Sequence, residues 1–299
     1  HDIGKGHPGD HTEVGMDLVV DIGDRMGLAA DDTAVLVDLV RLHLLLPDVA
    51  TRRDLSDEGT IRGVAQTVGD ARRLHLLAAL TEADSLATGP AAWGNWKAGL
   101  VRKLVQRVGH LLAGGDLAAL SVADFPDARQ LALLDAGELV VEGRGFTLEV
   151  VAADRPGLFG RVAGVLALHG LEVHAADVAS RGGMALEQFE VTSPFSPQVP
   201  WDAVIAHVHA ALADRLAIEA RLADRIRTYA RRPSGLGLPP PAVRFDDTSS
   251  ATATVIEVHA ADRIGLLYRV LAALSAFSLD VRTAKVQTIG EMVIDSFYV

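Results

Sequence analysis

A histidine–aspartate pair opens the chain and has the residue types of a metal site. His1 and Asp2 are adjacent. Further groups that bind metal or phosphate follow in chain order: Lys5, His11, His43 and Asp84. Imidazole and carboxylate ligands suit divalent ions such as manganese, iron or zinc. Such an ion polarises a phosphoryl oxygen and lowers the pKa of bound water, so the pattern predicts hydrolysis of a phosphate ester.

The expected metal ligands are His1, Asp2 and Asp84. As the cofactor we expect Mn²⁺ or Mg²⁺, with iron or zinc as alternatives. A His-Asp site usually needs another histidine upstream, and no residue precedes His1 in this sequence. The chain is therefore expected to be truncated within the site.

The remaining polar residues have candidate catalytic roles. His11 and His43 would complete a second metal position or contact the phosphate, and Lys5 would stabilise negative charge or assist the leaving group. Each also has an ordinary explanation. His43, within a helical pattern, fits a satisfied core histidine, and Lys5 fits a solvated loop cation.

Composition excludes several classes of protein. The 299 residues contain no cysteine, which removes disulfides, zinc–cysteine sites, iron–sulfur clusters and thiol nucleophiles. The net charge of -11 argues against nucleic-acid partners and anionic membrane surfaces. No apolar run approaches the length of a membrane span, and no signal peptide is visible. A cytoplasmic protein without nucleic-acid or membrane partners is expected.

The elements that must position the site are helices. Residues 1–115 show helical spacing without a convincing alternating strand. Predicted helices cover Thr33–Leu46, stopped by Pro47, then Ala71–Leu86 and Trp96–Leu112. A connector follows at 116–145, with a short helix near Asp127–Leu134 and a strand at Leu139–Glu142. The first third is predicted to be an all-α domain.

An internal repeat organises the rest of the chain. A shift of 108 residues places Leu148–Val173 on Ile256–Val281, and the register still holds at Met184/Met292 and Phe189/Phe297. Such an unbroken register implies two copies of one unit. Each copy has the pattern of a β-α-β-β unit, and the layout predicts an α+β ferredoxin-like fold on an antiparallel sheet.

The first copy is expected to continue beyond its four elements with a helix and a strand. A long helix from Trp201 to about Tyr229 and a closing strand at Ala242–Phe245 would give βαββαβ. The second copy stops at Val299, in its third strand, and is expected to be truncated with an open strand edge there.

Two equivalent loops precede the helices of the repeat. Unpaired backbone N–H groups at a helix start can take a carboxylate, and Asp154 or Asp262 can accept a hydrogen bond from a ligand amine. On local chemistry alone, an N-cap aspartate and a turn glycine explain both loops. The repeat resembles a tandem pair of ACT domains, small modules that bind amino acids and regulate attached enzymes. The resemblance implies effector binding at these residues: Asp154, Arg155, Gly157, Leu158, Asp262, Arg263, Gly265 and Leu266.

The helical part resembles the HD phosphohydrolase superfamily, whose pattern is His … His-Asp … Asp on an all-helical core. The domains are expected at 1–115 (HD), 146–247 (first ACT) and 252–299 (second ACT, incomplete). Their order, with five short motifs, is similar to the family of bifunctional uridylyltransferase/uridylyl-removing enzymes of the nitrogen regulator PII. Those motifs are GDHT at 9–12, RLHLL at 41–45, RRD at 52–54, TEAD at 81–84 and WGNWK at 93–97.

That resemblance implies a function. The removing half would hydrolyse the phosphodiester between UMP and a tyrosine of PII, under control of glutamine bound by the ACT pair. No Gly-Ser … Asp-x-Asp pattern of the transferase half is present in this sequence. Some relatives transfer AMP, so the removed nucleotide stays open. The alternatives are a (p)ppGpp hydrolase with ACT regulation and a catalytically inactive module that senses an amino acid.

Overall fold

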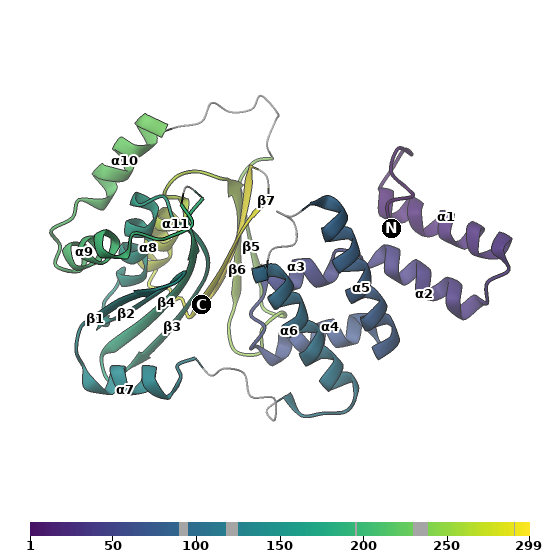
Figure 1. The fold of residues 1–299 in the computed structure, drawn as a ribbon, viewed down its shortest axis with the longest axis horizontal. Coiled ribbons are helices and arrows are strands. Elements are labelled where there is room, and N and C mark those ends of the chain that lie inside the picture. Colours follow the sequence, from purple (N-terminus) through teal and green to yellow (C-terminus); the bar gives the residue numbers. More distant parts are fainter. Residues whose placement is uncertain (90–94, 118–124, 195, 230–238, 290) are drawn as a thin grey trace. The chain divides into compact units, whose positions relative to one another are not determined.

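The computed structural model describes the chain except for residues 90–94, 118–124, 195, 230–238 and 290. It divides into two compact units (Figure 1). The first contains residues 1–121 and 249–251, and the second contains residues 122–248 and 252–299. Among the described residues, no helix has the length and apolar character needed to cross a membrane.

The described part of the first unit is built from helices, as the spacing predicts. In chain order they are α1 His11–Met26, α2 Ala30–Arg41, α3 Leu45–Arg52, α4 Glu58–Val68, α5 Ala71–Thr88 and α6 Asn95–Leu112. Aspartates cap three of these helices: the Asp10, Asp57 and Asp70 carboxylates accept hydrogen bonds from first-turn backbone N–H groups. The bounds of α5 and α6 confirm the helices predicted over Ala71–Leu86 and Trp96–Leu112.

Pro47 does not stop a helix, contrary to the sequence expectation. The predicted helix over Thr33–Leu46 is two helices: α2 ends at Arg41, and α3 begins at Leu45 with Pro47 in its first turn. Proline is tolerated there because the first-turn N–H groups have no intrahelical acceptor. The break between α2 and α3 leaves His43 in a short turn.

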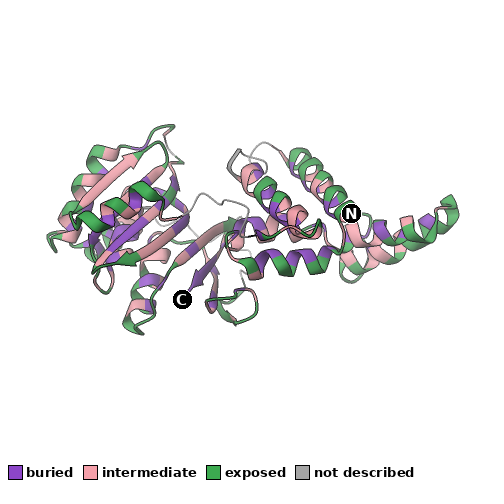
Figure 2. Ribbon diagram, turned by 90° about the horizontal axis from the view of Figure 1, so that it is seen from below, coloured by how far each residue is buried: buried purple, intermediate pink, exposed green. Residues whose placement is uncertain are grey.

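The helical unit has its core among α3, α4, α5 and α6. Leu46, Ile61, Leu74 and Leu104 are fully buried in it. The N-terminal helix α1 differs, because its only fully buried described residues are Gly15 and Gly23, and Figure 2 shows it mostly exposed or intermediate. A Cβ on Gly23 would stand 2.6 Å from the Thr33 hydroxyl, so α1 packs on α2 through close backbone approach.

The second unit is one eight-stranded antiparallel sheet with helices. Its strands are β1 Val140–Arg144, β2 Thr147–Ala153, β3 Glu172–Arg181, β4 Met184–Thr192, β5 Ala242–Asp246, β6 Val255–Ala261, β7 Thr283–Ile289 and β8 Met292–Tyr298. Its helices are α7 Ala128–Ala136, α8 Leu158–Leu168, α9 Trp201–Leu212, α10 Ile218–Tyr229 and α11 Leu266–Ala276. The strand order is β1-β2-β4-β3-β7-β8-β6-β5, so the two repeats join through β3 and β7.

The outer strands correct two expectations. The strand at 242–246, expected to close the first copy, is β5 and pairs with β6 of the second copy. β5 pairs with β6 in the second copy in the same way as β1 pairs with β2 in the first copy. The expected open edge at the end of the chain is also wrong, because β8 has β6 on one side and β7 on the other. Each repeat thus places an extra N-terminal strand at the outer edge of the sheet.

The long helix expected from Trp201 to Tyr229 is two helices. α9 ends at Leu212 and α10 starts at Ile218. Asp214, between them, has a φ of 55°, a left-handed conformation that an α-helix does not contain. Its carboxylate accepts hydrogen bonds from Arg155 and Arg161. These bonds attach the segment between α9 and α10 to the first loop and to α8.

Helices α8, α9, α10 and α11 cover one face of the sheet and enclose the larger core (Figure 1). Phe189 and Phe297, 108 positions apart in the repeat register, are both fully buried there. The opposite face of the first repeat is covered by α7, through Leu134 packed on Val151 and Leu186. The short helix and the strand expected in the connector are thus α7 and β1.

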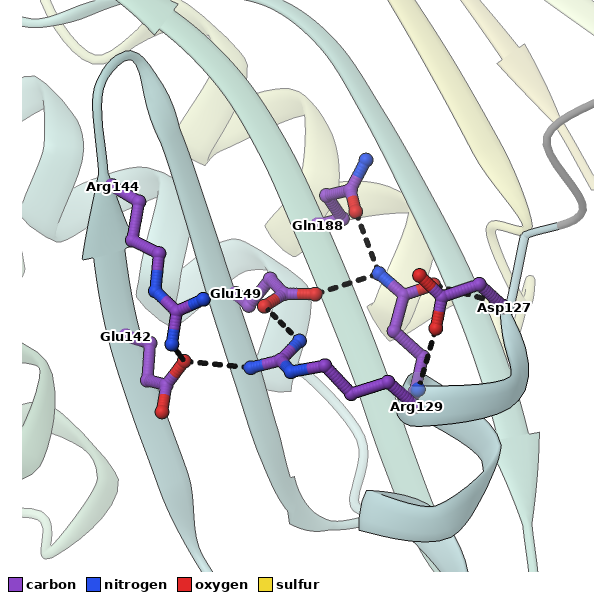
Figure 3. Close-up of polar contacts among 7 residues, drawn as sticks. Asp127, Arg129, Glu142, Arg144, Glu149 and Gln188 are labelled. Carbon is purple, nitrogen blue, oxygen red and sulfur yellow. Dashed lines mark hydrogen bonds and ion pairs between the residues drawn. The ribbon is translucent and has the colours of Figure 1, made fainter.

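A polar network fixes α7 on the sheet, as Figure 3 shows. Arg129 reaches Glu142 and Glu149, each at 2.7 Å. The buried Gln130 amide donates to Glu149 Oε1 at 2.6 Å and to Gln188 Oε1 at 2.7 Å, and its oxygen accepts from the Asp127 N–H. Gln130 therefore serves both as the capping box of α7 and as the link to two strands.

Replacing Gln130 by alanine should destabilise the second unit by about 1–2 kcal/mol, because it removes the capping box and the hydrogen bonds to two half-buried acceptors, Glu149 and Gln188. The measurement is the urea midpoint followed by circular dichroism. Arg144→Ala is the matched control, since its bond to Glu142 is exposed and such pairs contribute about 0–1 kcal/mol. Equal midpoints for both variants would contradict this role of Gln130.

Candidate metal centre

The sequence-predicted metal ligands lie together in the first unit. His1 Nε2 is 3.2 Å from Asp2 Oδ1 and 3.3 Å from Asp84 Oδ1. Ligand atoms of His1, Asp2 and His43 all lie within 4.8 Å of one another. Two imidazoles and two carboxylates thus converge from the N-terminal segment, the turn after α2, and α5. This donor set fits a divalent ion of the manganese, iron or zinc type.

A hydrogen bond to the backbone fixes the orientation of the His43 ring. The side chain is 8% exposed, and Nδ1 lies 2.7 Å from the Val40 carbonyl oxygen. Because a carbonyl only accepts, Nδ1 carries the proton and the lone pair of the neutral ring is on Nε2. The rings of His43 and His1 lie 4.8 Å apart between centroids. The sequence predicts a second metal position or a phosphate contact for His43, and the structure places its ring nitrogen within 4.8 Å of ligand atoms of His1 and Asp2.

Lys5 fixes the charge of Asp2. Its ammonium donates to Asp2 Oδ2 at 2.6 Å, while Oδ1 faces His1. The hydrogen bond from Lys5 lowers the pKa of the Asp2 carboxyl, which keeps it ionised as a metal ligand requires. The N-terminal segment folds back on α1 at Gly4, where a Cβ would stand 2.0 Å from the His11 carbonyl oxygen. Only glycine fits at that position.

His11 stands at the border of the cluster. It is the first residue of α1, and its ring lies 6.0 Å from that of His43 in an edge-on arrangement. At that distance His11 is suited to contact a substrate phosphate or a second ion beside the first. The assigned roles of all these residues stay predictions.

Sequence reasoning missed Asp48. It lies in the first turn of α3, five residues after His43, and pairs with Arg52 at 3.1 Å. Burial raises the pKa of the Asp48 carboxyl, although Arg52, Lys97 and His43 act in the opposite direction. The signal in the sequence is its position three residues after the RLHLL motif, with Arg52 and Arg53 four and five residues further on. Of the WGNWK motif, residues 93–94 and the side chains of 95–96 lie outside the described residues.

The two loops predicted to bind an effector have the same backbone structure. The Asp154 N–H donates to Gly183 O at 2.9 Å, and the Asp262 N–H donates to Glu291 O at 2.8 Å. Gly157 and Gly265 have φ values of 79° and 73° and start α8 and α11. Such positive φ angles explain glycine at both positions.

Other loop residues are already engaged. Arg155 donates to Leu212 O and pairs with Asp214 Oδ2 at 3.2 Å, and Leu158 is buried in the core. Arg263 is exposed, and Leu266 is half-buried at the start of α11. Effector binding by these eight residues stays a prediction.

A groove of about 740 Å³ lies next to the first loop, between α8, α10 and α11. Pro156 and Gly157 form one end of it, and Tyr268, Ala272 and Ser275 come from the second repeat. Most of the lining residues are small or apolar, which suits a small organic ligand.

The comparisons with known proteins match both parts of the chain. The ACT domain family model matches residues 146–198. This range covers most of the first repeat, including the first effector loop and the strands β2, β3 and β4. An ACT domain is therefore present in the second unit.

Three curated relatives align with the whole chain. Bifunctional uridylyltransferase/uridylyl-removing enzymes are 39% identical in Streptomyces coelicolor, 37% in Mycobacterium tuberculosis strain H37Rv and 33% in Rhodospirillum rubrum. The alignments take in 100% of this chain and 42%, 39% and 38% of those proteins. The chain thus spans about two fifths of the length of these relatives. No solved structure matches it significantly.

Proposed function

The chain is homologous over its full length to the C-terminal part of bifunctional uridylyltransferase/uridylyl-removing enzymes, and on this premise we propose that it carries the uridylyl-removing reaction. The first unit would be an HD-type hydrolase, and its substrate would be the uridylylated form of the PII signalling protein. The observation that supports the proposal is the convergence of His1, Asp2, His43 and Asp84. These are the residue types that hold a metal ion over a phosphate ester.

The reaction is the hydrolysis of a phosphodiester. A water oxygen bonds to phosphorus, the bond between phosphorus and the PII tyrosine oxygen breaks, and UMP and the tyrosine hydroxyl result. When bound, a divalent ion would supply Lewis-acid activation of the phosphoryl oxygen and of the water. Asp2, kept ionised by Lys5, and His43, fixed by Val40, would hold that ion. His11 would contact the phosphate, and Lys5 would stabilise charge on the leaving oxygen.

The second unit would regulate this reaction. The ACT family match and the sequence repeat support a pair of amino-acid-binding modules. The proposed effector is glutamine, and the proposed location is the cytoplasm. Glutamine can change the hydrolysis rate only if it binds one conformational state of the protein more tightly than the other.

Metal dependence of UMP release tests the proposal. Uridylylated PII is incubated with the chelator-treated protein, with and without Mn²⁺ or Mg²⁺, and UMP is measured by chromatography. We expect release only with metal, and a change in rate when glutamine is added. The same assay with (p)ppGpp and with adenylylated PII separates the alternative substrates. Failure to release any nucleotide with any divalent ion, also in a form extended upstream of His1, would make the first unit a scaffold for an amino-acid sensor.

A further inference from the structure

An apolar pocket lies next to the candidate metal centre. Its volume is about 260 Å³, and residues of α1, α2 and α5 in the first unit line it. Ile22 and Met26 come from α1, and Leu36 and Leu39 come from α2. Among the residues that line this pocket, only His1 has a side chain with hydrogen-bonding nitrogen or oxygen atoms. A pocket of this composition selects a ligand by its apolar surface.

The pocket and the metal centre share residues. His1 lines the pocket, while its Nε2 atom is 3.2 Å from Asp2 Oδ1 and 3.3 Å from Asp84 Oδ1. Val40 also lines the pocket, and its carbonyl oxygen is the acceptor that orients His43. A chemical group that is bonded directly to a phosphate at the metal centre would therefore reach the pocket.

The pocket presents apolar side chains that the core of the helical unit does not use. Ile3, Ile22, Met26 and Leu36 line it and are between 39% and 68% exposed. None of the four belongs to the buried cluster among α3, α4, α5 and α6, or to the partly buried residues that pack against that cluster. Exposed apolar groups gathered at a concave surface mark a place where a ligand or a partner binds. These four side chains are therefore available for contact with a substrate.

The substrate of the proposed reaction has two rings that could enter this pocket, the uracil base and the tyrosine ring. Uracil has two carbonyl groups and an N–H group, which would lose their hydrogen bonds to water there. Burying polar groups without partners is unfavourable, and His1 is the only residue of the lining whose side chain could supply one. The tyrosine ring is apolar over its faces and edges, and Met26 adds a sulfur atom that favours contact with an aromatic ring. An apolar cavity of roughly 150 Å³ suffices for benzene. The volume of about 260 Å³ thus admits the tyrosine ring.

We propose that this pocket receives the aromatic ring of the modified tyrosine while the phosphodiester lies at the metal centre. The proposal rests on the proposed function and adds that Ile22, Met26, Leu36 and Leu39 recognise the leaving group and not the base. When water attacks phosphorus, the bond from phosphorus to the tyrosine oxygen breaks and a proton of the water passes to that oxygen. The ring then leaves the pocket as tyrosine. The pocket contributes equally to the removal of UMP and of AMP from a tyrosine.

Methyl NMR of the whole chain tests ring binding without any hydrolysis. p-Cresol, which is the side chain of tyrosine, is titrated into protein labelled at its Ile, Leu, Val and Met methyl groups. We expect ring-current shifts of the Ile22, Met26 and Leu36 signals, and no shift of Val20, which is exposed on α1 outside the pocket. Uridine should shift none of these signals. Shifts caused by uridine, or none caused by p-cresol, would overturn the proposal.

Two other occupants of the pocket are tested in the same spectra. If dilution of the protein alone shifts the pocket signals, a second copy of the chain occupies the pocket. If p-cresol does not shift them in a form extended upstream of His1, the preceding segment occupies it. Either result overturns the proposal.

Leu36→Gln tests the role of the pocket in the reaction. Leu76→Gln is the matched control, because both leucines are 39% exposed on helices and Leu76 lies outside the pocket. For the p-cresyl ester of UMP, Leu36→Gln should lower kcat/KM about 10-fold, since loss of the apolar contact weakens binding of the ring. For the trifluoroethyl ester of UMP, whose leaving group has no ring, it should change kcat/KM by less than about twofold. The p-cresyl ester of AMP should lose the same factor as that of UMP, and Leu76→Gln should leave all three esters unchanged.

The esters also separate failure of this proposal from failure of the proposed function. Equal losses for the p-cresyl and trifluoroethyl esters of UMP in Leu36→Gln would overturn the proposal, and an unaffected AMP ester would then assign the pocket to uracil. No hydrolysis of any ester with any divalent ion would defeat the proposed function. The p-cresol titration would then decide by itself whether the pocket takes a phenol ring.

Discussion

Asp2→Ala and Asp84→Ala should each lower metal-dependent UMP release by about 10³-fold, the largest effect expected for this protein. Loss of the ion's Lewis-acid activation removes several kcal/mol of transition-state stabilisation, and each 1.4 kcal/mol is tenfold in rate. Asp2 and Asp84 both face His1 Nε2, at 3.2 and 3.3 Å from one oxygen each, so either variant removes a carboxylate from the ligand cluster.

Glu82→Ala is the matched control for Asp84. Glu82 lies two residues earlier on α5, on another side of the helix, and is exposed. Its removal should leave both UMP release and Mn²⁺ binding unchanged. Binding of Mn²⁺, measured by calorimetry, separates a lost metal from a lost substrate contact, because only the former weakens the affinity for the ion. Full activity of Asp2→Ala and Asp84→Ala would exclude this cluster as the reaction centre.

The sequence was sufficient to find the residues of this cluster, and it was less informative about their arrangement. Residue type predicts His1, Asp2 and Asp84 as ligands, and the packing of the helical unit brings Asp84 to 3.3 Å from His1, 83 positions earlier in the chain. His43 was placed in a helix, whereas it lies in a turn whose backbone orients its ring. That turn depends on a break before Pro47, and a helical apolar pattern contains no sign of such a break. Asp48 is not a member of the His1, Asp2 and His43 group, and an acid in a helix start has an ordinary explanation in the helix dipole.

The repeat could be predicted in more detail than the strand partners at its edges. The shift of 108 residues predicts two copies of one β-α-β-β unit, and the structure contains them as β2-α8-β3-β4 and β6-α11-β7-β8. The local pattern of Ala242–Phe245 shows that a strand exists and does not specify its neighbour. That neighbour is β6, because the extra strand of each repeat lies at the outer edge of the sheet. Long-range pairing of this kind depends on the whole sheet.

Asp295→Asn should stabilise the second repeat at neutral pH and remove most of its pH dependence. Burial, with a smaller effect of Asp262, raises the pKa of Asp295 to about 8, against 3.8 for an unperturbed group. Between these two pKa values the folded state keeps a proton that the unfolded state has released. The stability contributed by this group is complete below about pH 4 and falls as pH rises towards 8, by about 1.4 kcal/mol per pH unit. At pH 7 the loss amounts to about 4 kcal/mol.

Amide hydrogen exchange of peptides from β6 and β8 measures this effect locally. After correction for the intrinsic pH dependence of exchange, protection in the wild type should fall by up to about 10²-fold between pH 5.5 and 7.5. In Asp295→Asn it should stay nearly constant. Asp280→Asn, an exposed acid in the same repeat, should follow the wild type. Parallel profiles for Asp295→Asn and the wild type would show that Asp295 ionises in the folded protein without this penalty.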